Sequence, residues 1–399
     1  MVDNRIVFYP VGNGSMTLLQ VDNKSILFDI NILGASEDNG DYEVIDDLEK
    51  ALKKCETKNG HPVVDVFIQS HADNDHITGF VANFFEEDDP ENLMKNDKPG
   101  ERKKIFVREI WCSDRFRKYD TDDYSMGEDA KAFRREVKRR IDKYNEGNVA
   151  DGNRVLILGD SLDDDDSEAI PTGIRRGIGA TIKVGNTNNL LADIRGPIKQ
   201  QTGNKDDSYN ESDEDYRTSK NRSSLIIRFV LTLTDYLGKQ RIIHILMGDD
   251  AECFVWKSLD HKGLTSQLSY DLLLAPHHAS WHSLSKDSAT KTKDPKVDAD
   301  AKRALSQKKN NAVIVISAKA MTKETDEGRL AGRKLSIPEY ESIVGKGRVY
   351  NPNEIPSPDA PQPLVFVFTS RGLQKQSVRS EVPASVAATA TLGQTYPHG

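Results

Sequence analysis

The sequence predicts an α/β protein in which two β-sheets form a sandwich covered by helices. Short segments rich in β-branched and aromatic residues occur in both halves of the chain, and such segments are typical of strands. Segments with helical character lie between them in each half. Several of the expected strands end in clusters of histidine or aspartate, and the carboxyl ends of strands are where α/β sheets bind their ligands.

The expected strands begin with a β-meander, because three short apolar segments are separated by good turn sequences. The segments of this meander are residues 5–9, 16–21 and 25–30. Further strands are expected at residues 63–69, 104–112, 223–232, 241–247, 270–275, 312–317 and 364–369. Helices are expected at residues 42–55, 77–85, 130–144 and 251–259. The run 63–69 is apolar except for Asp65, as expected of a strand covered on both faces.

The composition is that of a water-soluble globular protein, with 37% hydrophobic and 30% charged residues. No apolar run approaches the roughly 18–20 residues of a membrane helix, and the N-terminus lacks the pattern of a secretory signal. The three cysteines are too far apart in sequence to predict a disulfide framework or a thiolate zinc site. We therefore expect a cytoplasmic protein without a membrane partner. The net charge of −8 argues against non-specific coating of nucleic acid.

One hydrolase domain is expected to span residues 1–370. Two charged or polar stretches without clear patterning, near 86–103 and 200–221, are expected to be inserted loops. Residues 371–399 are mostly Ser, Ala, Thr and Val without periodicity. They are expected to form a disordered tail.

Four potential metal ligands lie within six residues, directly after the expected strand 63–69: His71, Asp73, Asp75 and His76. Imidazole and carboxylate groups suit zinc, manganese or iron, and a tight turn can aim several of them inward. The alternative is a polar loop in which an aspartate caps the following helix.

Two further clusters follow apolar strands. The first contains Asp249 and Asp250, and the second contains His277 and His278. Neither is specific by itself, because aspartate is an ordinary turn residue and a histidine pair can simply pack against a sheet. Three such clusters, each at the end of a strand, predict a metal site to which all of them contribute.

The three motifs together resemble the metallo-β-lactamase superfamily. The pattern is His-x-Asp-x-Asp-His, then Gly-Asp near a glutamate, then Pro-His-His-x-Ser. Within the superfamily they are most similar to the soluble hydrolase domain of the bacterial competence protein ComEC and its stand-alone relatives. The resemblance runs from about residue 6 to residue 369, and residues 70–79 are its specific part. It implies an αββα sandwich with two divalent metal ions, zinc or manganese, between the sheets.

The resemblance also implies roles for individual residues. His71 and Asp73 would bind the first metal. Asp75 and His76 would bind the second metal, together with one histidine of the later pair, and a bridging aspartate would bind both. Asp75, His76 and that aspartate would be the catalytic residues. Asp29 would hold the ligand loop in place without touching the metals.

Two assignments within the later clusters stay open. Asp249 is favoured over Asp250 as the bridging and catalytic aspartate, because it directly follows Gly248. His277 is favoured over His278, because it lies nearer to the strand end. The neighbours expected to line the pocket are Ser280, Trp281 and His282, although His282 fits an exposed loop equally well.

The chain departs from the family pattern at the first metal. Asp73 stands where most members carry a histidine, and many members have a further histidine between the first motif and the bridging aspartate. Here the only histidine in that interval is His244, in mid-strand, where we expect a core residue. The first metal would then be weakly held, with Asp114 or water completing its ligands. An oxygen-rich set also shifts preference toward manganese or magnesium relative to zinc.

The expected reaction is hydrolysis, because two cations can activate water and polarise a substrate oxygen. No nucleophile elbow suggests a serine mechanism. The resemblance favours a phosphodiesterase with DNA or RNA as substrate. The basic helix at 130–144 either contacts phosphates or is an ordinary solvated face. The alternatives are a hydrolase of a small ester, lactone or nucleotide-type molecule, or a non-catalytic binding member of the fold.

Overall fold

The computed structural model describes residues 3–33, 42–86, 94, 100–114, 116, 126–160, 170–198, 221 and 224–376. Most of the two expected inserted loops lies outside these residues, as does the expected tail beyond residue 376. Among the described residues, no helix combines the length and apolar character that crossing a membrane requires.

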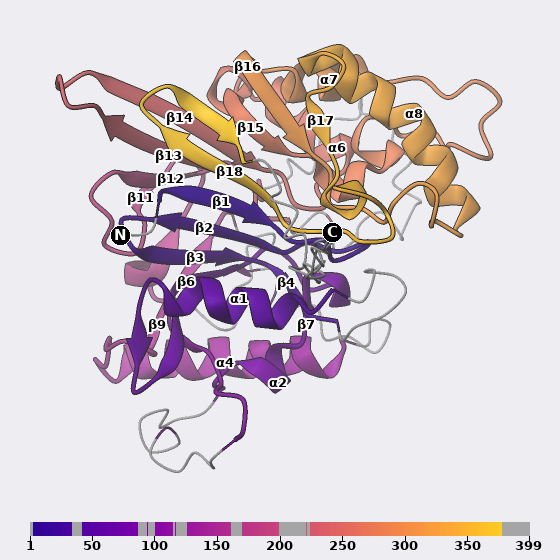
Figure 1. Cartoon of the computed structure of the whole chain (residues 1–399). Coiled ribbons are helices and arrows are strands. Elements are labelled where there is room, and N and C mark those ends of the chain that lie inside the picture. Colours follow the sequence, from indigo (N-terminus) through magenta and orange to yellow (C-terminus); the bar gives the residue numbers. More distant parts are fainter. Residues whose placement is uncertain are drawn as a thin grey trace, which may run out of the picture.

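Two large sheets pack face to face, and helices cover the outer face of each (Figure 1). One apolar core lies between the sheets and includes Phe28 and Ile68 of the first sheet and Ile245 of the second. A second core joins the first sheet to its helices, and a third joins the second sheet to its helices. The αββα sandwich predicted from the sequence is confirmed.

The first sheet has the strand order β10-β9-β8-β6-β3-β2-β1-β18-β19, with β5 paired to β6. Its strands are β1 (Arg5–Phe8), β2 (Thr17–Val21), β3 (Lys24–Phe28), β5 (Thr57–Lys58), β6 (His61–Gln69), β8 (Phe106–Ser113), β9 (Arg154–Leu158), β10 (Arg175–Arg176), β18 (Leu364–Thr369) and β19 (Gly372–Lys375). The central strands β3, β6, β8 and β9 are parallel. Every residue of β6 is buried, as expected of a strand covered on both faces.

The second sheet has the order β11-β12-β13-β14-β15-β16-β17. Its strands are β11 (Thr181–Lys183), β12 (Leu190–Ile194), β13 (Ile227–Thr234), β14 (Gln240–Met247), β15 (Tyr270–Leu274), β16 (Lys308–Val315) and β17 (Val349–Tyr350). The strands β14 to β17 are parallel, so their carboxyl ends meet at one edge. A separate short pair is formed by β4 (Ile30–Asn31) and β7 (Ile77–Thr78).

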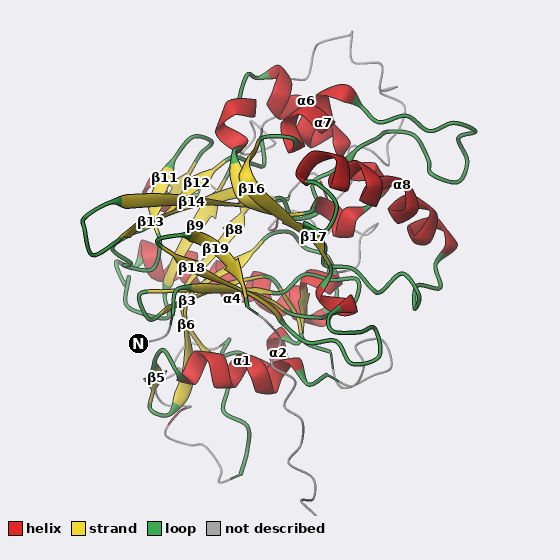
Figure 2. Cartoon of the chain, turned by 45° about the horizontal axis from the view of Figure 1, so that its top comes forward, coloured by secondary structure: helices red, strands yellow, loops and turns green. Residues whose placement is uncertain are grey.

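The helices on the first sheet are α1 (Val44–Lys53), α2 (Phe80–Asn83) and α4 (Glu128–Asn145). Those on the second sheet are α6 (Cys253–His261), α7 (Ala299–Leu305) and α8 (Glu327–Val344). Figure 2 shows these three on the side of β16 that faces away from the first sheet. Neither α7 nor α8 was expected from the sequence.

The helix expected at residues 77–85 is wrong for most of its length. Ile77–Thr78 is a strand, and α2 covers only four residues. Gly79, with φ of 93°, turns the chain between the two elements. The first backbone N–H groups of this turn are capped by Asp129 of α4, whose carboxylate accepts from Gly79 N at 2.9 Å and Val81 N at 2.8 Å. No aspartate of the metal motif caps α2, which removes the alternative reading of that motif.

Replacing Asp129 by alanine should lower the free energy of unfolding by about 1 kcal/mol, because the half-buried N–H of Gly79 and the exposed N–H of Val81 lose their acceptor. Urea denaturation followed by circular dichroism measures this change. Glu128→Ala is the matched control, since Glu128 lies in the same first turn with its side chain 82% exposed. Equal stability of the two variants would contradict the capping role.

Candidate metal centre

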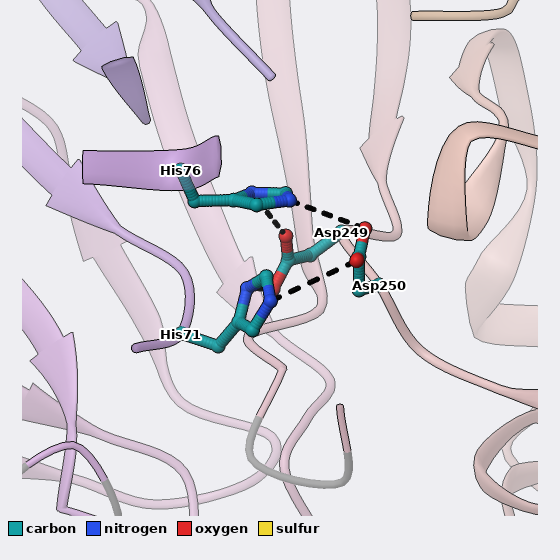
Figure 3. Close-up of side chains that lie close together, drawn as sticks. All are labelled: His71, His76, Asp249 and Asp250. Atoms are coloured by element: carbon teal, nitrogen blue, oxygen red, sulfur yellow. Dashed lines mark ion pairs between the residues drawn. The ribbon is translucent and has the colours of Figure 1, made fainter. Parts of the chain in front are cut away.

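The three clusters predicted from the sequence come together at one edge of the sandwich. They follow the carboxyl ends of β6, β14 and β15. The most buried group consists of His71, His76, Asp249 and Asp250, whose nearest ligand atoms all lie within 4.8 Å of one another. Figure 3 shows both imidazole rings and both carboxylates directed toward a common point.

The Asp250 carboxylate lies among the Nε2 atoms of four histidines. Its Oδ1 is 3.4 Å from Nε2 of both His76 and His278. Its Oδ2 is 3.7 Å from Nε2 of His71 and 3.8 Å from Nε2 of His277. Each oxygen of this carboxylate therefore faces a different pair of imidazole nitrogens.

These separations exceed the 2.7–3.2 Å or so of a protein hydrogen bond to nitrogen. They match the edge of a coordination shell instead, because two atoms about 2.1 Å from one tetrahedral ion are about 3.4 Å apart. His71 Nε2 is buried and has no hydrogen-bond partner in the described part of the chain. Imidazole nitrogen and carboxylate oxygen are donors that zinc and manganese accept. The residues present thus fit a divalent metal centre.

Asp73 and Asp75 approach the same cluster from the loop after β6. Asp73 Oδ2 is 3.5 Å from His71 Nε2, and Asp75 Oδ2 is 3.4 Å from His278 Nε2. One aspartate of the first motif therefore lies on each side of Asp250. Asp75, His76 and His278 form a second compact group of possible ligands.

The Nδ1 atoms of two rings face oxygens that can only accept. His76 Nδ1 is 2.9 Å from a carboxylate oxygen of Asp29, and His278 Nδ1 is 2.8 Å from the carbonyl oxygen of Ser317. Each Nδ1 must therefore carry the proton and donate it. The lone pair of each ring is then on Nε2, which is the arrangement typical of metal-binding histidines.

Asp29 supports the ligand loop through hydrogen bonds to Ser70 and His76. It is buried and accepts from the backbone N–H of Ser70 at 2.8 Å and from its hydroxyl at 2.6 Å. The same hydroxyl lies 3.2 Å from His71 Nδ1. One carboxylate therefore orients His76 directly and His71 through Ser70, which matches the supporting position expected for Asp29.

Asp249 occupies a different position from Asp250. Its oxygens are 2.9 Å from His71 Nδ1 and 3.1 Å from His76 Nδ1, whereas those of Asp250 face the Nε2 atoms. Both oxygens are buried, and neither meets hydrogen-bond geometry with any described group. The distances place Asp250, and not the Asp249 favoured from the sequence, between the Nε2 atoms. They likewise place His278, and not the favoured His277, in the compact group with Asp75.

The charges of the cluster shift the pKa values of its members. Burial would raise the pKa of Asp249, but the charges of His71 and His76 outweigh it and hold that pKa below its usual range. Burial would lower the pKa of both histidines, but the nearby carboxylates raise each above its ordinary value. Burial and the charge of Asp249 raise the pKa of Asp29 to about 6. A metal ion that binds here must displace protons.

The backbone turns sharply where the second and third clusters leave their strands. Asp249 has φ of 47°, and His277 and His278 have φ of 50° and 53°. This left-handed conformation costs a non-glycine residue of the order of 1–3 kcal/mol and tends to occur at functional sites. Gly248 is required beside it, since a Cβ there would lie 2.8 Å from a ring carbon of Trp256.

Gln69 fixes the shape of the first ligand loop, a role that the sequence did not reveal. Its side-chain amide donates to the carbonyl of His71 at 2.8 Å and to the carbonyl of His76 at 3.0 Å. Ser317 also escaped the sequence analysis, because its contact with His278 is made by a carbonyl group that every residue possesses. A glutamine as the last residue of an otherwise apolar buried strand was the one available signal.

Two residues considered from the sequence lie elsewhere. His244 is half-buried on β14, where its Nδ1 is 3.1 Å from Ser269 Oγ, consistent with a structural role. Asp114 is buried at the end of β8 and lies 3.7 Å from Arg175. It belongs to none of the groups of potential ligands found among the described residues.

A third group of potential ligands lies far from these clusters in the sequence and consists of Asp260, His261 and Asp300. Arg303 forms ion pairs with both of its aspartates. The guanidinium of Arg303 thus balances the charge of these carboxylates in place of a metal ion, and the group is an ordinary ion-pair network.

A cavity of about 420 Å³ opens beside the cluster. Asp73, Asp75 and Asp250 contribute to its wall. The predicted pocket residues Ser280, Trp281 and His282 line it as well. The cavity lies within the range of small-molecule sites, about 300–1,000 Å³, and it gives a substrate direct access to the candidate ligands.

Comparisons with known proteins add little to this geometry. No family model matches the chain. No curated protein matches it either. A solved structure of a mutant of the CmlA β-hydroxylase is similar over 88% of this chain, with 10% identity and a TM-score of 0.35, and the chain spans 52% of that protein's length. The metallo-β-lactamase MIM-1 from Novosphingobium pentaromativorans is similar over 75% of this chain and 86% of its own, with 14% identity and a TM-score of 0.27. At such TM-scores, the fold and the site rest on the sheet order and side-chain geometry of this chain.

Proposed function

We propose that the protein is a metal-dependent phosphodiesterase of the metallo-β-lactamase superfamily, related to the hydrolase domain of ComEC, with DNA or RNA as its substrate. The observation that carries this proposal is the position of Asp250, each of whose oxygens faces two imidazole Nε2 atoms. A carboxylate placed in this way suits a bridge between two metal ions. Many enzymes that cleave phosphodiesters with the help of metal use two ions.

The proposed ligands divide into two sets that share Asp250. The first set is His71, Asp73 and His277. The second set is Asp75, His76 and His278. His277 would then supply the histidine that the sequence lacks before Asp249, and side chains of this chain alone would hold the first zinc or manganese ion.

A bound metal pair would lower the pKa of a water molecule and polarise a phosphoryl oxygen of the substrate. The protein's own part is to fix the ligands before substrate arrives. Asp29 and the Ser317 carbonyl hold the rings of His76 and His278, and the cavity beside Asp250 receives the scissile group.

Two arginines of the basic helix α4 are engaged inside the fold and are therefore not free for the phosphate contacts that the sequence suggested as one possibility for this helix. Arg140 is buried, pairs with Glu136 and donates to the carbonyl groups of Val107 and Arg154. Arg139 pairs with the same glutamate. These charges stabilise the helix against the sheet, and substrate recognition is better sought at the cavity.

The test is cleavage of single-stranded and double-stranded DNA and RNA, and of bis(p-nitrophenyl) phosphate, with added manganese or zinc. We expect the wild type to hydrolyse at least one of these substrates, and Asp75→Ala to lose activity about a hundredfold or more, because it removes a charged ligand. The control Asp294→Ala, in an exposed loop with its side chain 75% exposed, should be fully active.

Other outcomes would replace the proposal. If every phosphodiester stays intact while a p-nitrophenyl ester or a lactone is hydrolysed, the protein is a small-ester hydrolase. If no substrate is hydrolysed and the purified chain carries fewer than two metal ions, it is a binding member of the fold.

A further inference from the structure

The first two turns of α8 form a second wall of the cavity. Gly328, Arg329, Gly332 and Arg333 all line it, and their spacing places them on one face of the helix. Gly332 lies beside Trp281, since a Cβ at this glycine would be 3.4 Å from the Trp281 Cβ, at van der Waals distance. The cavity thus extends from the candidate metal ligands to a pair of arginines.

Arg333 is held rigidly in this wall. It is 3% exposed, and its guanidinium donates to the carbonyl of Lys319 at 2.5 Å and pairs with Glu324. Glu324 is fixed in turn by the side-chain amide of Asn13, which donates to it at 2.9 Å. The Nε–H of Arg333 is buried and has no partner among the described groups. The Nε–H of Arg333 is therefore an unpaired donor whose position is fixed by the other contacts of this side chain.

Two more donors beside the cavity are unused. Trp281 is also 3% exposed, and its indole N–H finds no acceptor in the described residues. The Arg329 side chain is exposed, and no carboxylate of the described chain forms an ion pair with it. Its backbone N–H donates to the helix-capping Asp326 at 3.0 Å. Burying a donor without a partner costs about 1–3 kcal/mol, so the two buried donors, Arg333 Nε–H and the Trp281 indole N–H, favour an acceptor from outside the protein.

We propose that Arg329, Arg333 and Trp281 form a subsite for a second phosphate of the substrate, beside the phosphodiester that is hydrolysed. This inference deepens the proposed function and rests on it. A guanidinium group binds phosphate through paired N–H donors. The carboxylate of Asp326 also lines the cavity, where it accepts from the backbone N–H of Arg329, while the side chain of Arg329 stays available to a ligand.

The size of the cavity restricts the substrate. A volume of about 420 Å³ admits a ligand of nucleotide size and not a duplex, whose major groove alone is about 12 Å wide. The substrate is then a chain end with a terminal phosphate, or a small phosphodiester that carries a second phosphate. A 5′-phosphorylated ten-residue oligothymidylate and the dinucleotide pdTpdT distinguish these two sources, since only the preferred one is cleaved rapidly.

The subsite is tested by calorimetric titration of the metal-loaded full chain with thymidine 3′,5′-bisphosphate and thymidine 5′-monophosphate. We expect the wild type to bind the bisphosphate about tenfold or more tightly than the monophosphate. Arg329→Gln should abolish this difference. Lys334→Gln, which removes an exposed charge from the same helix outside the cavity, should preserve it.

The proposal is overturned if the wild type shows no gain from the second phosphate, or if Arg329→Gln keeps the gain. Arg333→Lys provides an independent check, because it keeps the charge and loses the planar donor group, and it should reduce the gain if it folds as judged by circular dichroism. Binding requires no turnover. If the bisphosphate binds more tightly than the monophosphate but no diester is hydrolysed, the subsite is supported and the proposed function is wrong. If a diester is hydrolysed but the bisphosphate binds no more tightly, the proposed function is supported and the subsite is wrong.

Discussion

Replacing Asp250 by asparagine is expected to remove hydrolytic activity and metal together. The carboxylate oxygens of Asp250 face two pairs of imidazole nitrogens at 3.4–3.8 Å, and an amide keeps the size of the side chain but supplies only one weak oxygen donor. The rate should fall about a thousandfold or more, equivalent to about 4 kcal/mol of transition-state stabilisation. Metal content by plasma mass spectrometry should fall from two ions to one or none per chain.

The matched control is Asp249→Asn, since Asp249 is the adjacent aspartate and is equally buried. Its oxygens lie beside the Nδ1 atoms of His71 and His76, so this variant should keep more metal than Asp250→Asn. The reverse order, with Asp249→Asn losing both ions and Asp250→Asn keeping them, would transfer the bridging role to Asp249.

Removing Asp29 should weaken metal binding without removing a ligand. Alanine at this position leaves three donors without an acceptor, which are the backbone N–H and hydroxyl of Ser70 and Nδ1–H of His76. The supporting groups of metal-binding histidines commonly contribute about 10–100-fold to affinity, and buried donors without acceptors cost about 1–3 kcal/mol each. Competition with a chromophoric chelator measures the first effect, and urea denaturation of the metal-loaded protein measures the second.

Asp29→Asn separates orientation from simple loss of packing. Its side-chain oxygen can still accept one of the three hydrogen bonds, so affinity and stability should fall between those of the wild type and Asp29→Ala. If Asp29→Ala binds metal as tightly as the wild type, the histidine rings are held by other contacts and the role assigned to Asp29 is wrong.

The sequence predicted the layered fold because most of its strands have strong local signals. The strand expected at residues 364–369 has the same bounds as β18, and its alternating burial follows the period of a strand with one covered face. The helix α8 had no comparable signal, since Pro338 lies inside it and its apolar positions form no clear stripe. Asp326 caps its first turn, but a single aspartate is equally common in an ordinary turn and does not by itself predict a helix.

The site was predicted at the level of its motifs and not at the level of its atoms. Strand ends placed the three clusters correctly at one edge. The choice between Asp249 and Asp250 depended on a left-handed turn at Asp249, which sends successive side chains in directions that spacing does not predict. The same holds for His277 and His278, whose backbones are both left-handed. Arg333 was missed because its position depends on contacts with Glu324 and Lys319 that only the packed helix creates.

The division of the candidate ligands between the two sheets has a consequence for how the molecule assembles. His71 and His76 follow a strand of the first sheet, and Asp250 and His278 follow strands of the second. Neither half of the chain contains a complete set of the proposed ligands, so a metal ion bound by these sets would be held only after the two sheets have docked. Its binding free energy then adds to the cohesion between the halves, because an ion that binds only the docked state favours that state. A metal ion at this centre would in this way hold the two sheets together at one edge of the sandwich. The supply of metal would then influence how long the docked state of the two sheets persists.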